Sequence, residues 1–257
     1  MTTMTSRASV GELLRQWRER RRLSQLDLSI QADISTRHLS FVETGRSQPT
    51  PTMIMRLTEQ LEVPLRERNA LLLAGGYAPA YPQHGLDEPE LQSVRAALRQ
   101  VLAGHDPYPA IVVNRWWELL DSNAGIAVLI EGCAAELLEP PLNVLRLSLH
   151  PDGMAPRIAN LPEWRAHLLT RLHRQAQATG DPRLAALHDE LGAYPGGEGA
   201  PPKPADVAVP LRYRGDDGEL SFVSITAVIG TPMDVTVEEL AIESFYPADD
   251  QTAAALA

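Results

Sequence analysis

Residues 23–50, LSQLDLSIQADISTRHLSFVETGRSQPT, constrain the fold of this 257-residue chain more than any other stretch. Ser24 and Ser35 are each good N-caps, because a serine hydroxyl accepts a hydrogen bond from the backbone that starts a helix. Asp33 stands between the two predicted helices, and aspartate tolerates the left-handed conformation that a tight turn needs. Gly45 ends the second helix. Two short helices joined by such a turn are typical of a DNA-binding helix-turn-helix.

Helical patterns flank this pair on both sides. Before it, apolar residues recur at helical spacing, at Val10, Leu13, Leu14 and Trp17. After it, a fourth helix is predicted beyond SQPTP and a fifth over residues 66–74, followed by the Gly- and Pro-rich stretch GGYAPAYPQHG. The sequence therefore predicts an all-α domain of five helices over residues 1–75 and a linker over residues 76–85.

The helix capped by Ser35 is the predicted DNA-reading element, because the second helix of such a pair lies in the major groove. Leu39 and Val42 face the core, so Thr36, Arg37, Ser40 and Phe41 point outward. Among these, Arg37 can donate two hydrogen bonds to a guanine. The candidate DNA-binding residues are Gln25, Ser35, Thr36, Arg37, Ser40, Phe41 and Arg46.

The other candidates have different expected roles. Thr36 and Phe41 offer apolar surface to a thymine methyl group, whereas Gln25 and Arg46 are placed to contact phosphate. The alternative is a plain helical bundle with a polar face, but such a face usually carries Glu and Lys, and this one has no acid before Glu43.

Glu43 is predicted to have a structural role instead. Together with Arg18 it forms a predicted ion pair between the first and third helices. Such a pair, when buried, contributes orientation more than net stability.

The charge of the chain is divided unevenly between its two parts. Residues 1–78 carry 11 Arg against 8 acidic residues, which gives +3, and residues 79–257 carry 12 basic against 25 acidic residues, which gives −13. The two sum to the net charge of −10. A basic head on an acidic body fits a head that binds a polyanion and a body that does not.

The stretch SQLDLSIQADISTRHLSFVETGRSQPT resembles the helix-turn-helix of the XRE family, the phage-repressor-type regulators, over about residues 9–75. The resemblance implies that Gln25 holds a phosphate, that the outward residues named above contact bases, and that the Arg–Glu pair forms. Two departures stand out: Asp33 replaces the usual turn glycine, and Ser29 replaces the usual alanine packed between the two helices. Both replacements are small enough to fit.

Residues 86–257 are predicted to form an α+β body. AIVVN and WELLDSN indicate a hairpin around the turn at Arg115 and Trp116, and three strand-like runs, VAVPLRYR, ELSFVSITAVIG and ELAIESFYP, close the chain. Helices are predicted at the apolar repeats from Leu91 to Leu102 and over residues 124–130, 161–178 and 182–191, and YPGGEGAPPKP is predicted as a loop. Both faces of ELSFVSITAVIG are largely apolar, so we expect both to be covered.

The motifs of several other protein classes are missing from the sequence. The seven His are scattered, Cys133 is the single Cys, and neither GxSxG nor a phosphate-binding loop occurs, so we predict no enzyme, no metal site and no disulfide. No apolar stretch approaches the ~20 residues that a membrane span needs. We therefore expect a soluble cytoplasmic protein.

Three further blocks, NALLLAGGYAP, DPYPAIVVNRWWELLDSNAGIAVLI and ELSFVSITAVIGTPMDVTVEELAIESFYPADDQT, resemble the MmyB-like transcription regulators. The resemblance runs over most of residues 60–252 and is looser over 131–204. In that family a XRE head is joined to a PAS-like ligand-binding domain. The resemblance implies a pocket for a fatty acid or a similar apolar small molecule between the sheet and its covering helices. We expect no cofactor besides such an effector.

The pocket residues are predicted from strand faces and from the needs of an acyl carboxylate, which requires a cation or a hydrogen-bond donor. The candidate ligand-binding residues are Val112, Trp117, Leu119, Arg146, His167, Arg171, Phe222 and Ser224. For each Arg a solvated helix face is the alternative, and Trp117 also suits a core position.

Taken together, these patterns predict a homodimeric, ligand-responsive regulator that binds a palindromic operator in double-stranded DNA. Two other interpretations stay open. In one, the body serves only to dimerise the protein; in the other, it is a redox or light sensor of PAS type that carries a cofactor.

Overall fold

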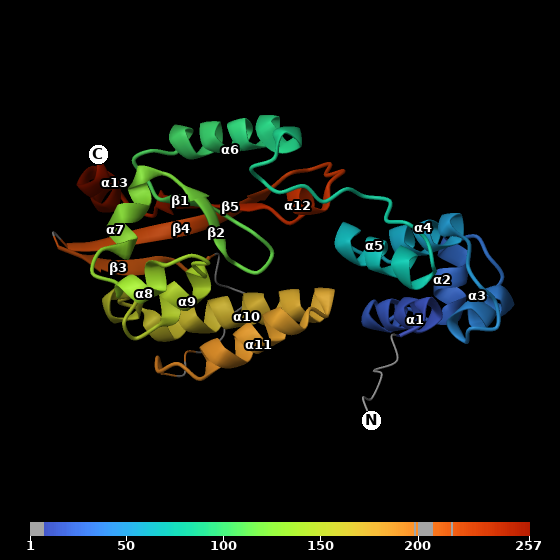
Figure 1. Ribbon diagram of the computed structural model, residues 1–257. Coiled ribbons are helices and arrows are strands. Elements are labelled where there is room, and N and C mark those ends of the chain that lie inside the picture. The colour runs from blue at the N-terminus through green and yellow to red at the C-terminus, as the bar shows by residue number, and fades with distance from the viewer. Residues whose placement is uncertain (1–7, 198, 200–207, 217) are drawn as a thin grey trace, which may run out of the picture. The chain divides into compact units, whose positions relative to one another are not determined.

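The computed structural model describes residues 8–197, 199, 208–216 and 218–257. These residues form two compact units (Figure 1). The N-terminal unit comprises Met1–His84 together with Pro232–Glu238, and the C-terminal unit comprises Gly85–Thr231 together with Glu239–Ala257. The chain therefore passes from one unit to the other more than once.

The N-terminal unit contains the five predicted helices, which confirms the all-α head. They are α1 (Val10–Arg20), α2 (Gln25–Gln31), α3 (Thr36–Glu43), α4 (Pro51–Gln60) and α5 (Leu65–Ala74). Ser24 and Ser35 cap α2 and α3 as predicted, and Asp33 has the left-handed φ of 51° that the turn requires. A short helix from late in the chain, α12 (Val235–Glu238), joins this unit, and Glu238 Oε2 accepts a hydrogen bond from the backbone N–H of Leu65 at 2.7 Å.

The core of the N-terminal unit is aliphatic, with Leu14, Leu28, Leu39, Ile54 and Leu57 fully buried. Helices α1 and α3 approach so closely that Gly11 lies directly against the backbone of α3. A Cβ atom at Gly11 would overlap the carbonyl oxygen of Val42.

We expect Gly11→Ala to destabilise the protein, although alanine is the better helix former. The overlap is with backbone, which cannot rotate away, and overpacking of this kind costs roughly 1–3 kcal/mol, more than the ~1 kcal/mol that helix propensity returns. Gly104→Ala is the control, because Gly104 ends helix α6 (Gln92–Gly104) and nothing lies within 4 Å of its Cβ position. Thermal unfolding followed by circular dichroism should show a lower Tm for Gly11→Ala alone. Equal Tm values for the two variants would contradict the packing argument.

The C-terminal unit is an antiparallel sheet between layers of helices, an α+β PAS-like domain as predicted. Its strands are β1 (Ala110–Val113), β2 (Leu119–Ser122), β3 (Leu211–Gly215), β4 (Gly218–Val228) and β5 (Ala241–Pro247), in the order β2-β1-β5-β4-β3. Besides α6, its helices are α7 (Ala127–Ile130), α8 (Ala135–Leu138), α9 (Val144–Leu149), α10 (Leu161–Thr179), α11 (Pro182–Gly192) and α13 (Asp250–Leu256). Short 3-10 turns lie at Pro89–Leu91, Ala124–Ile126 and Ala155–Arg157.

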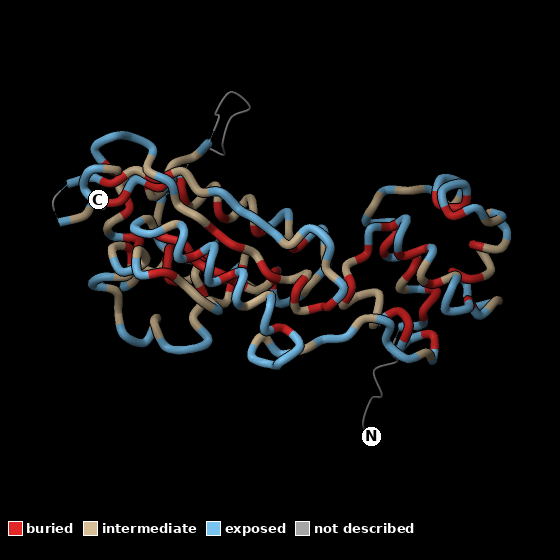
Figure 2. Tube along the Cα trace, turned by 90° about the horizontal axis from the view of Figure 1, so that it is seen from above, coloured by how far each residue is buried: buried red, intermediate tan, exposed pale blue. Residues whose placement is uncertain are grey.

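The helices cover the two sheet faces unequally. Helix α6 lies over one face, and α8 to α11 lie on the other (Figure 1). The larger core is on the α10 side, and a smaller cluster joins Leu98 and Leu102 of α6 to Val112 and Ile242. Figure 2 shows the buried residues concentrated in the interior of each unit, with exposed residues along its outer surface.

Two strand predictions need correction. The run VAVPLRYR forms a strand only from Leu211, since residues 208–210 are not extended in the sheet and Val207 lies outside the described residues. The expectation that both faces of β4 are covered is wrong: Ile225 is 52% exposed and Val228 68% exposed. Helix α6 packs over β1 and Ile242 of β5 and leaves Ile225 uncovered on that face, whereas Val228 lies on the opposite face, in register with Ala241. The predicted loop YPGGEGAPPKP lies largely outside the described residues.

Candidate DNA-binding surface and ligand cavity

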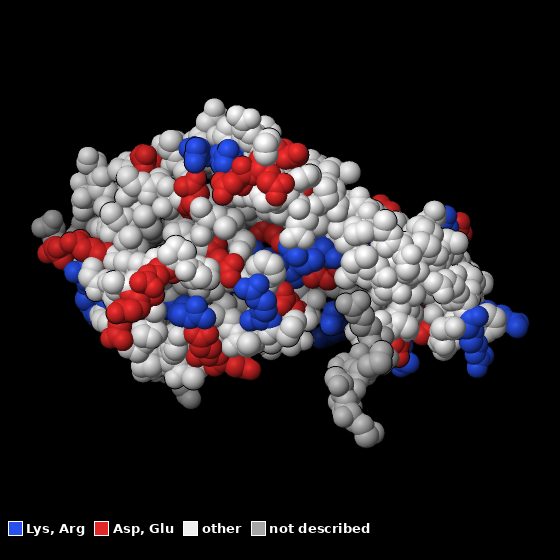
Figure 3. All heavy atoms as spheres, in the orientation of Figure 1, with Lys and Arg blue, Asp and Glu red and all other residues white. Residues whose placement is uncertain are grey.

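The exposed side of α3 carries two arginines around one aromatic ring. The guanidinium carbon of Arg37 lies 5.3 Å from the ring centre of Phe41, and that of Arg46 lies 5.9 Å from it. Both arginines are exposed and Phe41 is half-buried. Figure 3 shows Arg side chains projecting from the N-terminal unit beside α3. This surface offers cations to phosphate or bases, with an apolar ring beside them.

The two candidates at the start of α3 form bonds within the protein. The Ser35 hydroxyl accepts a hydrogen bond from the His38 backbone N–H at 3.1 Å, so it acts as the helix cap. The Thr36 hydroxyl shares a 2.8 Å hydrogen bond with the Ser29 hydroxyl of α2. Ser29 therefore links the two helices directly, a contact that an alanine at this position could not make. Ser40 is half-buried, and its carbonyl oxygen accepts a bond from the Thr44 hydroxyl.

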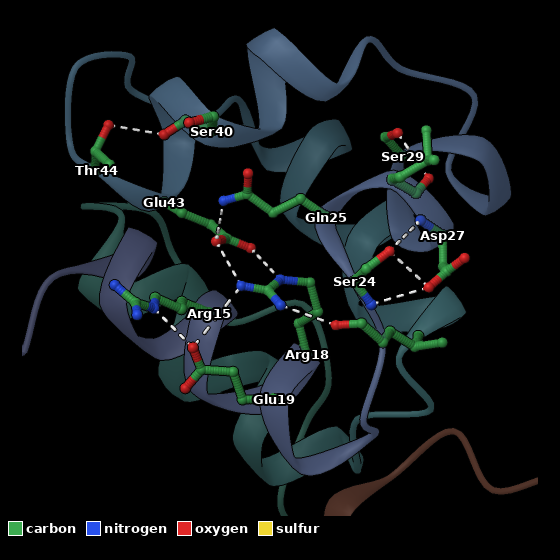
Figure 4. A network of polar contacts seen from close by, with 12 residues as sticks. Arg15, Arg18, Glu19, Ser24, Gln25, Asp27, Ser29, Ser40, Glu43 and Thr44 are labelled. Carbon is green, nitrogen blue, oxygen red and sulfur yellow. Dashed lines mark hydrogen bonds and ion pairs between the residues drawn. The ribbon is translucent and has the colours of Figure 1, made fainter.

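A buried polar network joins α1, α2 and α3 (Figure 4). The Arg18 Nε donates to Glu43 Oε1 at 2.7 Å and its Nη2 to Oε2 at 2.9 Å, which forms the predicted pair. The Glu43 carboxylate, through these hydrogen bonds, raises the pKa of Arg18 above its ordinary value. Gln25 Nε2 donates to Glu43 Oε2 at 2.8 Å, so the amide N–H of this phosphate candidate is engaged inside the unit. The role of Gln25 in phosphate binding stays a prediction.

The C-terminal unit encloses an apolar cavity between the sheet and the α9–α10 side. Its empty space is about 830 Å³, counting its open mouth. The lining residues come from strands β1 to β5 and from α7, α9 and α10, among others, and most are aliphatic or aromatic. Among the described residues that line it, Arg171 and Glu243 carry charge, and none is His or Cys.

Four of the candidate ligand residues line this cavity: Trp117, Leu119, Arg171 and Ser224. Trp117 stands in the β1–β2 turn with a positive φ of 67°, and its Nε1 donates to Gln175 Oε1 at 2.8 Å. The guanidinium of Arg171 lies over the Trp117 ring, 4.5 Å from its centre. The turn and helix α10 thus form one wall of the cavity together.

The other four candidates do not line the cavity. Two of them lie on strands of the sheet. Val112 points to the α6 side, because neighbouring residues of a strand face opposite ways and Ile111 faces the cavity. Phe222 is fully buried in the core, edge-on to Phe245 with ring centres 6.4 Å apart. Phe245, its neighbour, is the ring that reaches the cavity.

The remaining two candidates are engaged elsewhere. Arg146 Nε and Nη2 donate to the carboxylate of Glu190 at 2.6 and 2.8 Å, in a separate surface hollow beside α11. The hydrogen bonds from Arg146 lower the pKa of Glu190. His167 stacks on Trp164 with ring centres 5.5 Å apart. Burial, together with the nearby Arg171 cation, lowers the pKa of His167.

Glu243 is the cavity residue that the sequence analysis missed. It lies on β5, in register with Ile111 of β1 and Thr226 of β4, at the centre of the sheet. Its side chain is only 5% exposed. The signal was present in ELAIESFYP, where the acid Glu243 directly follows three apolar residues, Leu240, Ala241 and Ile242.

Comparison with known proteins bears on both units. A family model for the helix-turn-helix domain matches residues 9–71, and one for the MmyB-like transcription regulator ligand binding domain matches residues 94–257. No curated protein matches the chain. Among solved structures, one described as the structure of an RNA-binding light-oxygen-voltage receptor aligns at 15% identity and a TM-score of 0.27. That alignment covers 94% of this chain, which spans only 60% of the other.

A helix-turn-helix domain joined to a ligand-binding domain with an apolar cavity defines a ligand-responsive transcription regulator. The chain belongs to the MmyB-like transcription regulators. Neither matching family is an enzyme family, which agrees with the prediction that the protein is not an enzyme. In the part of the chain that the structure describes, no helix combines the length and hydropathy of a membrane span.

Proposed function

We propose that the protein binds a near-palindromic DNA operator as a homodimer, and that an apolar, fatty-acid-like molecule in the cavity of the C-terminal unit changes this binding. The apolar cavity carries the proposal. Its wall of aliphatic and aromatic side chains favours a hydrocarbon chain, because burial of apolar surface contributes about 25 cal/mol per Å².

Dimerisation supplies affinity that a single head lacks. A head with a formal charge of +3 attracts DNA only modestly. Two linked heads gain avidity when they bind half-sites one helical turn apart, ~34 Å. The ligand can act only through a difference in its affinity for the DNA-competent and the other arrangement of the dimer.

Native mass spectrometry of the purified full-length protein tests the dimer and the ligand together. We expect a dimer mass with a copurified apolar compound, and we expect removal of that compound to change the affinity for an operator selected from random duplexes. A flavin or haem in the spectrum would contradict the ligand proposal in favour of a cofactor-bearing sensor. A dimer without a bound compound, whose DNA affinity does not change when acyl compounds are added, would contradict the ligand proposal and favour a domain that only dimerises.

A further inference from the structure

The charged residues of the cavity wall neutralise each other. Arg171 of α10 donates from Nη2 to Glu243 Oε1 at 2.5 Å and from Nη1 to Oε2 at 3.1 Å, so both carboxylate oxygens face the guanidinium. The Thr226 hydroxyl donates to Glu243 Oε1 at 2.9 Å and lies 2.8 Å from Arg171 Nη2. The face of the guanidinium rests on Trp117. The guanidinium of Arg171 is therefore already paired with the carboxylate of Glu243.

We propose that the cavity takes a compound with a long hydrocarbon chain whose polar end is uncharged, such as an alcohol, amide or ester, and that Glu243 sets this preference by occupying Arg171. The inference rests on the proposed function, since it concerns the ligand of the same cavity. It makes Glu243 the residue that determines head-group specificity.

A carboxylate head would meet an unfavourable site. To bind Arg171 it would have to displace Glu243, whose side chain is 5% exposed and would remain buried as an unpaired charge. If it bound beside Glu243 instead, the two like charges would repel each other at short range. The Arg171 side chain is 30% exposed, so water screens the Arg171–Glu243 ion pair only in part.

Neutral hydrogen-bonding groups in the wall, by contrast, are open to a ligand. The hydroxyls of Ser122 and Ser224 both line the cavity, and neither forms a side-chain hydrogen bond within the described residues. A hydroxyl can donate and accept, so it can satisfy an alcohol, an amide or a carbonyl without any change in charge. These two serines fit a head group that brings no charge of its own.

A head-group series on the wild-type protein tests the proposal directly. Decanol, decanamide and decanoate share one hydrocarbon length, and at about pH 8 the last is a full anion. With delipidated full-length protein and calorimetry, we expect the two neutral compounds to bind at least about tenfold tighter than decanoate. Decanoate binding equally or more tightly would overturn the inference and leave the proposed function intact. Failure of all three to bind would overturn both.

The variant Glu243→Gln tests the assigned residue. Glutamine keeps the shape and can still hydrogen-bond, but it releases the charge of Arg171, so we expect the decanoate-to-decanol affinity ratio to rise about tenfold. Glu190→Gln is the matched control, because it removes the carboxylate of another bidentate arginine pair outside the cavity, and its ratio should stay at the wild-type value. An unchanged ratio in a folded Glu243→Gln protein, or an equal rise in Glu190→Gln, would overturn the role of Glu243. The wild-type series decides the head-group preference even where the variant fails to fold.

Discussion

Replacement of Glu43 by alanine is expected to lower the unfolding free energy of the N-terminal unit by about 3–5 kcal/mol. The Glu43 side chain is 1% exposed and that of Arg18 10% exposed, so the change leaves a guanidinium buried without its carboxylate. It also removes the acceptor of the Gln25 amide. Thermal and urea unfolding of the full chain, monitored by a signal from the N-terminal unit, measure the loss of unfolding free energy.

Two further variants separate the buried charge from other effects. Glu19→Ala breaks the Arg15–Glu19 pair, whose side chains are 59% and 51% exposed, and it should change stability by less than about 1 kcal/mol. The double variant Arg18→Met with Glu43→Leu removes both charges, so it should recover much of the loss of the single variant. A Glu43→Ala protein as stable as Glu19→Ala would show that the pair contributes orientation without stability.

The sequence predicted the N-terminal unit well because its signals are local. A serine cap or an aspartate in a left-handed turn acts on the few residues beside it, so Ser24, Asp33 and Ser35 mark helix boundaries without knowledge of the fold. The Arg18–Glu43 pair is a longer-range contact, which was predicted from opposite charges on the first and third helices and agreed with the resemblance to a known family.

The cavity was harder to predict because its lining depends on which face of each strand meets which helix layer. A shift of one residue along a strand moves a side chain to the opposite face, which is why Val112 does not line the cavity while its neighbour Ile111 does. The position of an arginine side chain depends on partners far away in the chain. Arg146 pairs with Glu190 outside the cavity, whereas Arg171 lines the cavity and pairs with Glu243. Neither partner was predicted.

Replacement of Arg37 by alanine is expected to weaken binding to the selected operator by about 1–3 kcal/mol, roughly 5- to 150-fold, and to abolish the base preference at one position in each half-site. Arg37 is exposed on α3 beside Phe41, where a major-groove helix presents its base contacts. Fluorescence anisotropy against the operator and its single-base variants measures both effects.

Arg46→Ala is the matched control for Arg37→Ala, since it removes the same charge from a second arginine beside Phe41. A phosphate contact carries no sequence information, so this variant should weaken binding equally to all duplexes and lower the salt dependence by about one counterion. The comparison thus distinguishes base recognition from phosphate binding at two arginines that lie beside the same aromatic ring. If both variants lost affinity alike and kept the wild-type base preference, Arg37 would contribute to affinity and not to base recognition. The specificity would then have to come from another element or from DNA shape.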